Sequence, residues 1–239
     1  MDEYVQKKNI AKCFKAIKFI YAELDETEDI YKKDEKYNNT NWTNGPNYMF
    51  FRLFKKKLLP NYIEYFMYME PDTIPIRSFW IDKIIRECRD EDTFWIKGSI
   101  YRGNEWDKYI DKIDFRYHIN GNALYTYNNN NFKKFLDLVE KEYPKEISYD
   151  VAISNFIFNS KNWKITSKIF HKYRYSNFIE NIGTIKCQKQ LDISQCIHNK
   201  DDVFFLHIKK QENRKNIFEN KVYTYFDIYN NIEKKRIYV

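Results

Sequence analysis

The chain has 239 residues, of which 43% are hydrophobic and 19% aromatic, so it can build a core, and disorder along its whole length is excluded. Its formal net charge of +7 is compatible with an anionic partner such as nucleic acid, an anionic membrane or a phosphorylated ligand. The basic residues are scattered and form no run with interleaved aromatics, so we expect no nucleic-acid partner.

The first part of the chain contains two apolar segments separated by a polar one. Residues 4–16 are predicted to form a short helix, and Ala16–Ala22 a strand that leads into an acidic stretch. Residues 32–47 are polar and rich in asparagine, which predicts a loop. Apolar side chains at helical spacing predict a helix over Tyr48–Leu59, which Pro60 ends.

The strongest strand signal follows this helix. Tyr62–Met69 is an almost continuous apolar and aromatic run, which predicts a central buried strand. Pro71 and Pro75 then disfavour regular ladder pairing. Ser78 is expected to cap a helix over Phe79–Arg89.

Further strands and helices alternate in the second half of the chain. Phe94–Ser99 is predicted as a short strand, and His118–Tyr127 is an apolar run that contains a glycine. Asn131–Tyr143 has the pattern of an amphipathic helix, and Ser148–Phe158 fits a helix or a strand. Asp202–His207 is predicted as a late strand.

This alternation of elements predicts the fold class. Strands alternating with helices indicate an α/β protein with a mainly parallel central sheet flanked by helices. Ligands of such sheets bind at the carboxyl ends of strands, where Glu70, Gly98 and His207 fall. No linker divides the chain, so we expect a single domain over residues 1–239, with residues 211–239 as a peripheral charged segment.

Two carboxylates follow the predicted central strand. Glu70 and Asp72 would face the same side of an extended backbone. A divalent cation that holds a diphosphate often needs only one or two protein carboxylates, and flanking prolines stiffen the turn. On this pattern alone a metal site and an ordinary surface turn both stay open, because short motifs often match by accident.

Five segments of the sequence, taken together and in their order along the chain, favour the metal site. They are Met69–Trp80, Phe94–Gly103, His118–Tyr125, Ser148–Ala152 and Phe205–Lys210. Their order resembles that of the GT-A fold glycosyltransferases, which use nucleotide sugars. The resemblance is strongest to viral and eukaryotic members, among them enzymes of large DNA viruses, whose metal-binding DXD motif is a Glu-Pro-Asp variant. It implies a Rossmann-like nucleotide-diphospho-sugar transferase fold and a glycosyltransferase activity.

The resemblance also implies a set of functional residues. Asp72, Glu70 and His207 would bind Mn²⁺ or Mg²⁺, which stabilises the charge of the diphosphate leaving group. A strand-end histidine held by the backbone is the alternative for His207. The donor sugar and its diphosphate would contact Lys97, Gly98, Ser99, Lys209 and Lys210. The acceptor or the sugar would contact His118, Asn120, Gly121 and Asn122.

Several of these residues also have ordinary structural interpretations. The asparagines would otherwise stabilise a turn, and His118 would otherwise be a buried structural histidine. By resemblance, Asp150 is the general base that takes the proton of the acceptor hydroxyl in an inverting enzyme, and helix capping is its alternative. Aromatic residues near the site are expected either to stack on sugar or base or to belong to the core: Trp80, Trp95, Tyr101, Trp106 and Tyr125.

The chain departs from the family pattern at two points. The first nucleotide-binding strand of the fold is missing or disguised in residues 4–16, and Glu70 stands where the motif usually has aspartate. A catalytically inactive descendant that binds a glycan or a protein is therefore the second interpretation. The active form would take a nucleoside diphosphate sugar as donor and a glycan or glycoprotein as acceptor.

Cellular location is predicted from three features. The four cysteines form no CxxC pair, and no apolar run approaches the roughly 20 residues that span a bilayer. The amino terminus lacks the basic-then-apolar pattern of a signal peptide. We expect a cytoplasmic protein without a transmembrane segment, located in the host cytoplasm or the virion if the chain is viral.

Overall fold

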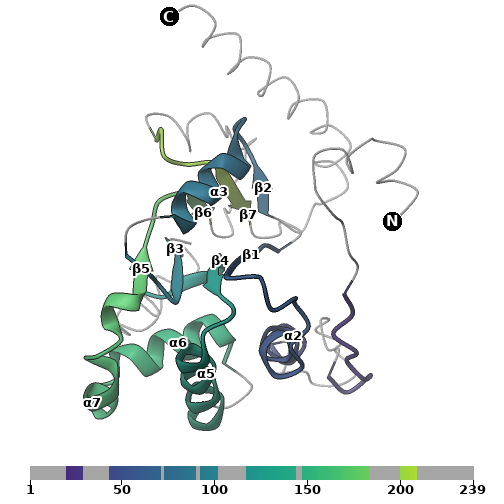
Figure 1. Cartoon of the computed structure of the whole chain (residues 1–239), viewed down its shortest axis with the longest axis vertical. Helices are drawn as coiled ribbons and strands as arrows, with labels where there is room; N and C mark the ends of the chain where they lie inside the picture. Colours follow the sequence, from purple (N-terminus) through teal and green to yellow (C-terminus); the bar gives the residue numbers. More distant parts are fainter. Residues whose placement is uncertain are drawn as a thin grey trace, which may run out of the picture. The chain divides into compact units, whose positions relative to one another are not determined.

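A computed structural model gives the fold (Figure 1). It describes residues 20–28, 43–70, 73–89, 92–101, 117–143, 147–182 and 200–208. The chain divides into two compact units, residues 1–60 and 61–239, and the predicted single domain stays a prediction. The elements predicted over residues 4–16 and 211–239 lie outside the described residues. Residues 20–22, the described part of the predicted first strand, form no strand.

The described helix of the first unit is α2, Asn44–Lys55. It confirms a helix in this region, but both ends lie four residues earlier than predicted, so the helix ends at Lys55 and Pro60 does not end it. Phe50 and Phe54 are buried one turn apart, with ring centroids 5.4 Å apart. From the same helix Arg52 binds the acidic segment before it, since its Nη2 lies 2.6 Å from Oε1 of Glu28.

The end of α2 follows a known helix-termination pattern with an unusual residue. The backbone N–H of Leu58 donates to the carbonyl of Leu53 at 3.2 Å, and that of Lys57 donates to Phe54 at 3.4 Å. These two bonds define a Schellman motif, whose left-handed position glycine normally occupies. Lys57 takes that position with φ 51°, so it carries backbone strain that glycine would avoid.

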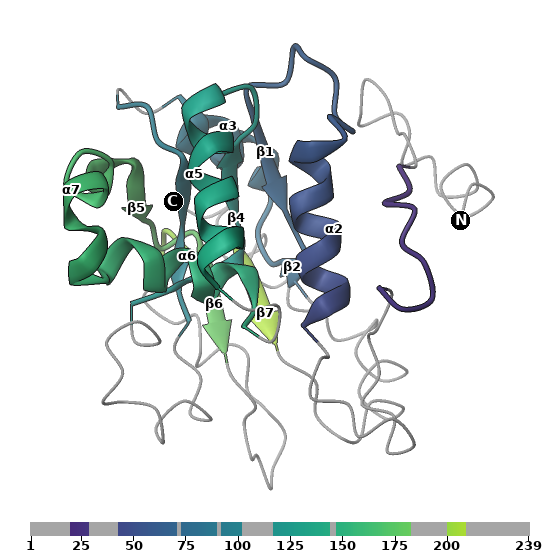
Figure 2. The same cartoon turned by 90° about the horizontal axis from the view of Figure 1, so that it is seen from below.

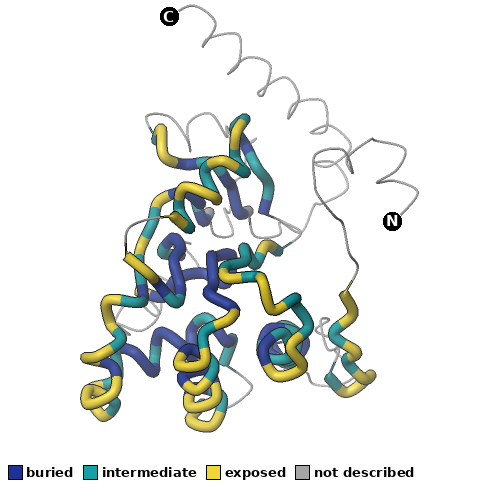
Figure 3. The backbone as a smooth tube through the Cα atoms, in the orientation of Figure 1, coloured by how far each residue is buried: buried dark blue, intermediate teal, exposed yellow. Residues whose placement is uncertain are grey.

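The larger sheet of the second unit has four described strands in the order β1-β4-β3-β5. They are β1 (Tyr65–Tyr68), β3 (Ile96–Ile100), β4 (Ile119–Thr126) and β5 (Tyr173–Tyr175). β4 pairs antiparallel with both β1 and β3, whereas β5 pairs parallel with β3. All residues of β4 are buried (Figure 3), because it has a strand on each side, α6 packs on it and Leu124 belongs to the core cluster shared with the smaller sheet.

A smaller sheet has the order β2-β7-β6. Its strands are β2 (Thr73–Pro75), β6 (Ile179–Ile182) and β7 (Phe205–Ile208). β2 is antiparallel and β6 parallel to the central β7. Pro75 therefore does take part in a ladder, contrary to our expectation, because it lies at the end of an edge strand, where its missing N–H is tolerated.

Two other predictions about the sheet were wrong. The α/β class is confirmed, but of the five strand pairings among the described residues three are antiparallel, so the sheets are mixed and not mainly parallel. The apolar run Tyr62–Met69 forms β1, a half-buried edge strand and not a central one. Among the described residues its backbone pairs with one strand, β4, while Tyr65 also contacts Phe94 and Tyr68 contacts Tyr149 of α6.

Three longer helices cover the sheets of this unit. They are α3 (Trp80–Cys88), α5 (Asn130–Glu142) and α6 (Tyr149–Phe158). α6 packs on β4 and α5 packs on α6, while α3 lies with the smaller sheet on the other side of the larger one (Figure 1). The same arrangement is seen from below in Figure 2, where α5 and α6 lie in front of α3. Ser78 does not cap α3, since Phe79 precedes the helix with φ 59°.

Short turns lead from α6 to β5. They are η4 (Ser160–Asn162), α7 (Trp163–Thr166) and η5 (Phe170–Lys172). The core cluster joins the two sheets through Phe94, Leu124, Phe178, Ile179 and Phe205. Among the described residues, no helix is long and apolar enough to cross a membrane.

Candidate functional site

Glu70, which follows β1, is tied to the buried strand β4 by Asn122. The side-chain oxygen of Asn122 accepts hydrogen bonds from the backbone N–H of Glu70 at 2.6 Å and from the hydroxyl of Thr73 at 2.7 Å. Its side-chain nitrogen donates to Oε2 of Glu70 at 3.0 Å and to Oδ1 of Asn120 at 2.8 Å. All four hydrogen-bonding positions of this amide are thus used. Asn122 and Asn120 lie inside β4, and Asn122 holds the segment that follows β1.

The strand register of the smaller sheet brings His207 to the same place. His207 of β7 lies opposite Thr73 of β2, and its imidazole is buried. Its Nε2 atom lies 3.4 Å from Oε2 of Glu70, whose side chain is 40% exposed. Two of the three residues predicted to bind a metal therefore meet, although 137 positions separate them in the sequence (207 − 70).

Asn181 fixes the orientation of this histidine. It lies next to His207 in the parallel pairing of β6 with β7, and it is buried. Its side-chain nitrogen donates to the carbonyls of Ser99 at 3.2 Å and Ile100 at 3.3 Å, so its Oδ1 faces Nδ1 of His207 at 3.0 Å. Because Oδ1 can only accept, Nδ1 carries the proton in the neutral imidazole. The Nε2 lone pair then faces Glu70.

Nε2 of His207 and Oε2 of Glu70 are both electron-pair donors in that tautomer. Such a contact is stabilised by a positive charge, which is either a second proton on the imidazole or a cation between the two atoms. Two ligands bound at about 2.1 Å to one cation lie about 3.0–3.4 Å apart at octahedral to tetrahedral angles. The observed separation fits adjacent ligands of one divalent cation.

The third predicted metal ligand, Asp72, lies outside the described residues, as do Lys209, Lys210 and Trp106. Within the described part of the chain, no group of three or more His, Cys, Asp or Glu side chains is placed to hold a metal ion. Glu70 and His207 alone supply two protein ligands. One or two carboxylates are sufficient for a cation that also binds substrate phosphates, so the pair fits such an ion.

Asp150 lies at the start of α6 and contacts the same strand. Its Oδ2 accepts the N–H of Gly121 on β4 at 2.9 Å, and its Oδ1 accepts the N–H of Val151 at 2.9 Å. A Cβ at Gly121 would lie 2.3 Å from the hydroxyl of Tyr149, so this glycine is required by the packing of α6. Burial raises the pKa of Tyr149 well above its usual value, so its hydroxyl stays protonated.

The three described residues among those predicted to contact the donor have contacts within the protein. Nζ of Lys97 lies 2.7 Å from Oε2 of Glu87. A Cβ at Gly98 would lie 2.7–2.8 Å from side chains of β4, so the neighbouring strand accounts for this glycine without a ligand. The hydroxyl of Ser99 donates to the carbonyl of Ser176 at 2.6 Å.

The aromatic candidates lie in the core or beside the histidines. Tyr101 is buried between two of them, with its ring centroid 5.8 Å from that of His118 and 6.4 Å from that of His207. His118 is itself buried. Trp80, Trp95 and Tyr125 pack on core rings or on the backbone.

Sequence reasoning missed Asn181, which carries no local signal because it is one more asparagine in a chain rich in them. Comparisons of the chain with protein-family models, curated proteins and solved structures find no match. The site is therefore interpreted from its geometry and from the motif resemblance.

Proposed function

We propose that the chain is a metal-dependent glycosyltransferase that moves a sugar from a nucleoside diphosphate sugar to a glycan or protein acceptor. The observation that supports this proposal is the contact between Glu70 and the oriented Nε2 atom of His207. Asn181 contacts Nδ1 of His207 and is itself held by backbone carbonyls of β3. Asn122 donates to Oε2 of Glu70 and accepts from the backbone N–H of Glu70. A site in which both ligand groups are fixed by buried amides is preorganised for a cation.

Glu70 and His207 would hold Mn²⁺ or Mg²⁺, with Asp72 as a further ligand. The cation supplies electrostatic stabilisation of the negative charge on the departing nucleoside diphosphate. In the transfer, the acceptor oxygen forms a bond to the anomeric carbon. The bond from that carbon to the diphosphate breaks, and its electron pair leaves with the diphosphate.

Asp150 is our candidate for the base that receives the proton of the acceptor hydroxyl. Two backbone N–H groups orient its carboxylate, and one of them belongs to Gly121, which lies between Asn120 and Asn122 on β4. A general base must be held within hydrogen-bond reach of its proton, and these contacts provide a fixed position. This role applies to an inverting enzyme.

Calorimetry of the full chain with Mn²⁺ and a panel of nucleoside diphosphates tests the proposal. We expect a nucleoside diphosphate to bind only when the cation is present. The variants His207→Ala and Asp72→Asn should weaken this binding at least tenfold, since each removes a ligand of the cation. The matched control is His171→Ala, because His171 is exposed and lies outside the site.

Two results would contradict the proposal. One is binding of the nucleotide with equal affinity without a cation. The other is the absence of any binding across the panel, which would instead favour the inactive descendant that binds a glycan or protein.

A further inference from the structure

The segment between α6 and β5 forms a small knob, defined as residues 160–172. Consecutive backbone hydrogen bonds hold it together, from Ser167 to Trp163 at 3.0 Å and from Ile169 to Thr166 at 3.0 Å. Thr166 is buried and anchors the knob to the rest of the unit. In Figure 1, α7 lies at the periphery of its unit, and Figure 3 shows that most of the knob is exposed.

Large apolar side chains are exposed on this knob. Trp163 is 65% exposed, Ile165 44% and Phe170 46%. Single exposed apolar residues are common on soluble proteins, but three within eight positions of one surface segment require an explanation. In α7 the residues Trp163, Lys164 and Ile165 are all exposed, and Thr166 is buried.

The remaining exposed charges of the knob are positive. Lys161, Lys164 and Lys168 are exposed, and residues 151–179 contain no Asp or Glu. One acidic side chain of a neighbouring element contacts the knob, since Oε1 of Glu142 accepts a hydrogen bond from Asn162. Asp92 pairs with Arg174, which lies two residues beyond the knob.

We propose that the knob binds the surface of an anionic lipid bilayer. Trp, Phe and Ile side chains enter the boundary between headgroups and acyl chains, while lysines between them extend to the lipid phosphates. Tryptophan is suited to this boundary because its ring is apolar and its N–H is polar. The inference does not depend on the proposed enzymatic activity.

The charge of the knob favours this partner over two others. A second copy of the chain would bring like charges together, which opposes self-association through this face. Single-stranded nucleic acid would use the basic charge and the aromatic rings, but it gives no role to the exposed Ile165. A bilayer accommodates all three apolar side chains and the lysines.

Vesicle co-sedimentation of the full chain tests the proposal. We expect binding to vesicles of phosphatidylserine and phosphatidylcholine, little binding to phosphatidylcholine alone, and release by high salt. Each basic residue near an anionic surface contributes about fivefold to partitioning, so Lys164→Gln with Lys168→Gln should weaken binding about 10–30-fold. Trp163→Ser should weaken it at least about tenfold.

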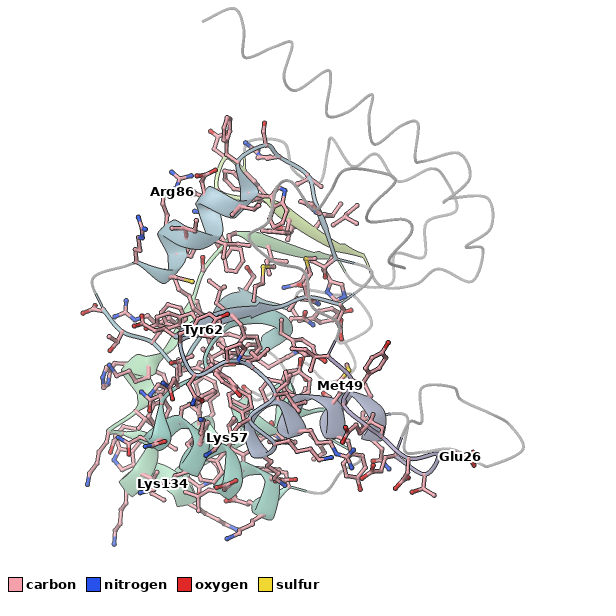
Figure 4. All side chains as sticks on the ribbon, turned by 45° about the vertical axis from the view of Figure 1, so that its right-hand side comes forward. Glu26, Met49, Lys57, Tyr62, Arg86 and Lys134 are labelled. Carbon is pink, nitrogen blue, oxygen red and sulfur yellow. The ribbon has the colours of Figure 1, made fainter. Side chains whose placement is uncertain are left out.

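The chain offers matched controls for both changes. Lys134→Gln with Lys141→Gln removes the same charge from the exposed face of α5, where Lys134 points away from the helix (Figure 4). Tyr62→Ser removes an aromatic side chain that is 77% exposed outside the knob. Both controls should leave vesicle binding within about twofold of wild type, and thermal unfolding checks that every variant is folded.

Three outcomes would overturn the proposal. The first is equal binding of wild type and knob variants to anionic vesicles. The second is no vesicle binding together with binding of a single-stranded oligonucleotide that the lysine variant weakens. The third is no vesicle binding together with a dimer in sedimentation analysis that Trp163→Ser converts to a monomer.

Discussion

Replacing Asn181 by leucine tests the geometry of the site most directly. The change removes two bonds to the carbonyls of Ser99 and Ile100 and one to His207, all in a buried environment. At about 1 kcal/mol for each hydrogen bond, we expect the free energy of unfolding to fall by about 2–4 kcal/mol. For a chain of this size that corresponds to a decrease of about 5–15 °C in Tm.

The second expected effect is on the imidazole itself. In the neutral form of the imidazole in metal-free wild type, ¹⁵N NMR should find the proton of His207 on Nδ1, because Oδ1 of Asn181 accepts there. Leucine cannot accept, so in the variant the proton should move to Nε2, where Glu70 accepts it, and affinity for Mn²⁺ should fall. The spectrum of His207→Ala assigns the signal among the four histidines.

Asn128→Leu is the control, because the side chain of Asn128 donates a single exposed hydrogen bond, to Asn61. It should change the free energy of unfolding by less than about 1 kcal/mol. Finding the Nε2–H tautomer in wild-type protein would refute the reasoning, as would a stability loss no larger than that of the control.

Three further predictions concern stability measured by urea and thermal unfolding. Lys57→Gly should stabilise the chain by about 1 kcal/mol, because glycine adopts the left-handed position without strain, whereas Lys57→Ala should not. Gly121→Ala should destabilise it by about 1–3 kcal/mol, and Tyr149→Phe in the same chain should recover part of this loss by removing the clashing oxygen. Burial raises the pKa of Glu87, but hydrogen bonds and charges of Lys83 and Lys97 outweigh it, so the net pKa is lowered. The contribution of Glu87 to the free energy of unfolding is therefore present above the unfolded-state pKa of about 4.5 and is lost as the pH falls through the folded-state pKa. Glu87→Gln should therefore make the free energy of unfolding depend less on pH in the acid range.

One experimental outcome would contradict each of these predictions. Equal stability of the glycine and alanine variants at position 57 would mean that φ 51° carries no strain. Failure of Tyr149→Phe to recover any stability would assign the cost at position 121 to the backbone. An unchanged slope with pH would remove Glu87 as a source of acid sensitivity.

Local signals in the sequence were sufficient for the elements with clear periodicity. The helix over 131–143 is observed as α5, where Asn129 caps it by accepting from two backbone N–H groups. For the apolar run His118–Tyr127 we predicted no element, and it forms β4. The helix alternative for Ser148–Phe158 is observed as α6.

Strand partners could not be read from the same signals. α3 joins β2 of the smaller sheet to β3 of the larger one, so a helix between two strands does not here imply parallel neighbours. The position of the run Tyr62–Met69 at the edge depends on which strand pairs with it, and that is a property of the whole fold.

The candidate site shows the same difference between what local signals predict and what long-range contacts decide. The convergence of Glu70 with His207 was predicted through the order of motifs, and Asp150 with Gly121 was placed in the same neighbourhood. Neither the amide that orients His207 nor the packing reason for Gly121 could be predicted, because each depends on a contact between distant segments.

The position of Asn181 has a consequence for how this chain tolerates change. Its side-chain amide links the two sheets, because Asn181 belongs to β6 of the smaller sheet and donates to carbonyls of β3 in the larger sheet. The residue that orients His207 therefore also joins one sheet to the other. Even without the proposed activity, this packing role would constrain Asn181, whereas substitutions of Glu70 would be tolerated more easily.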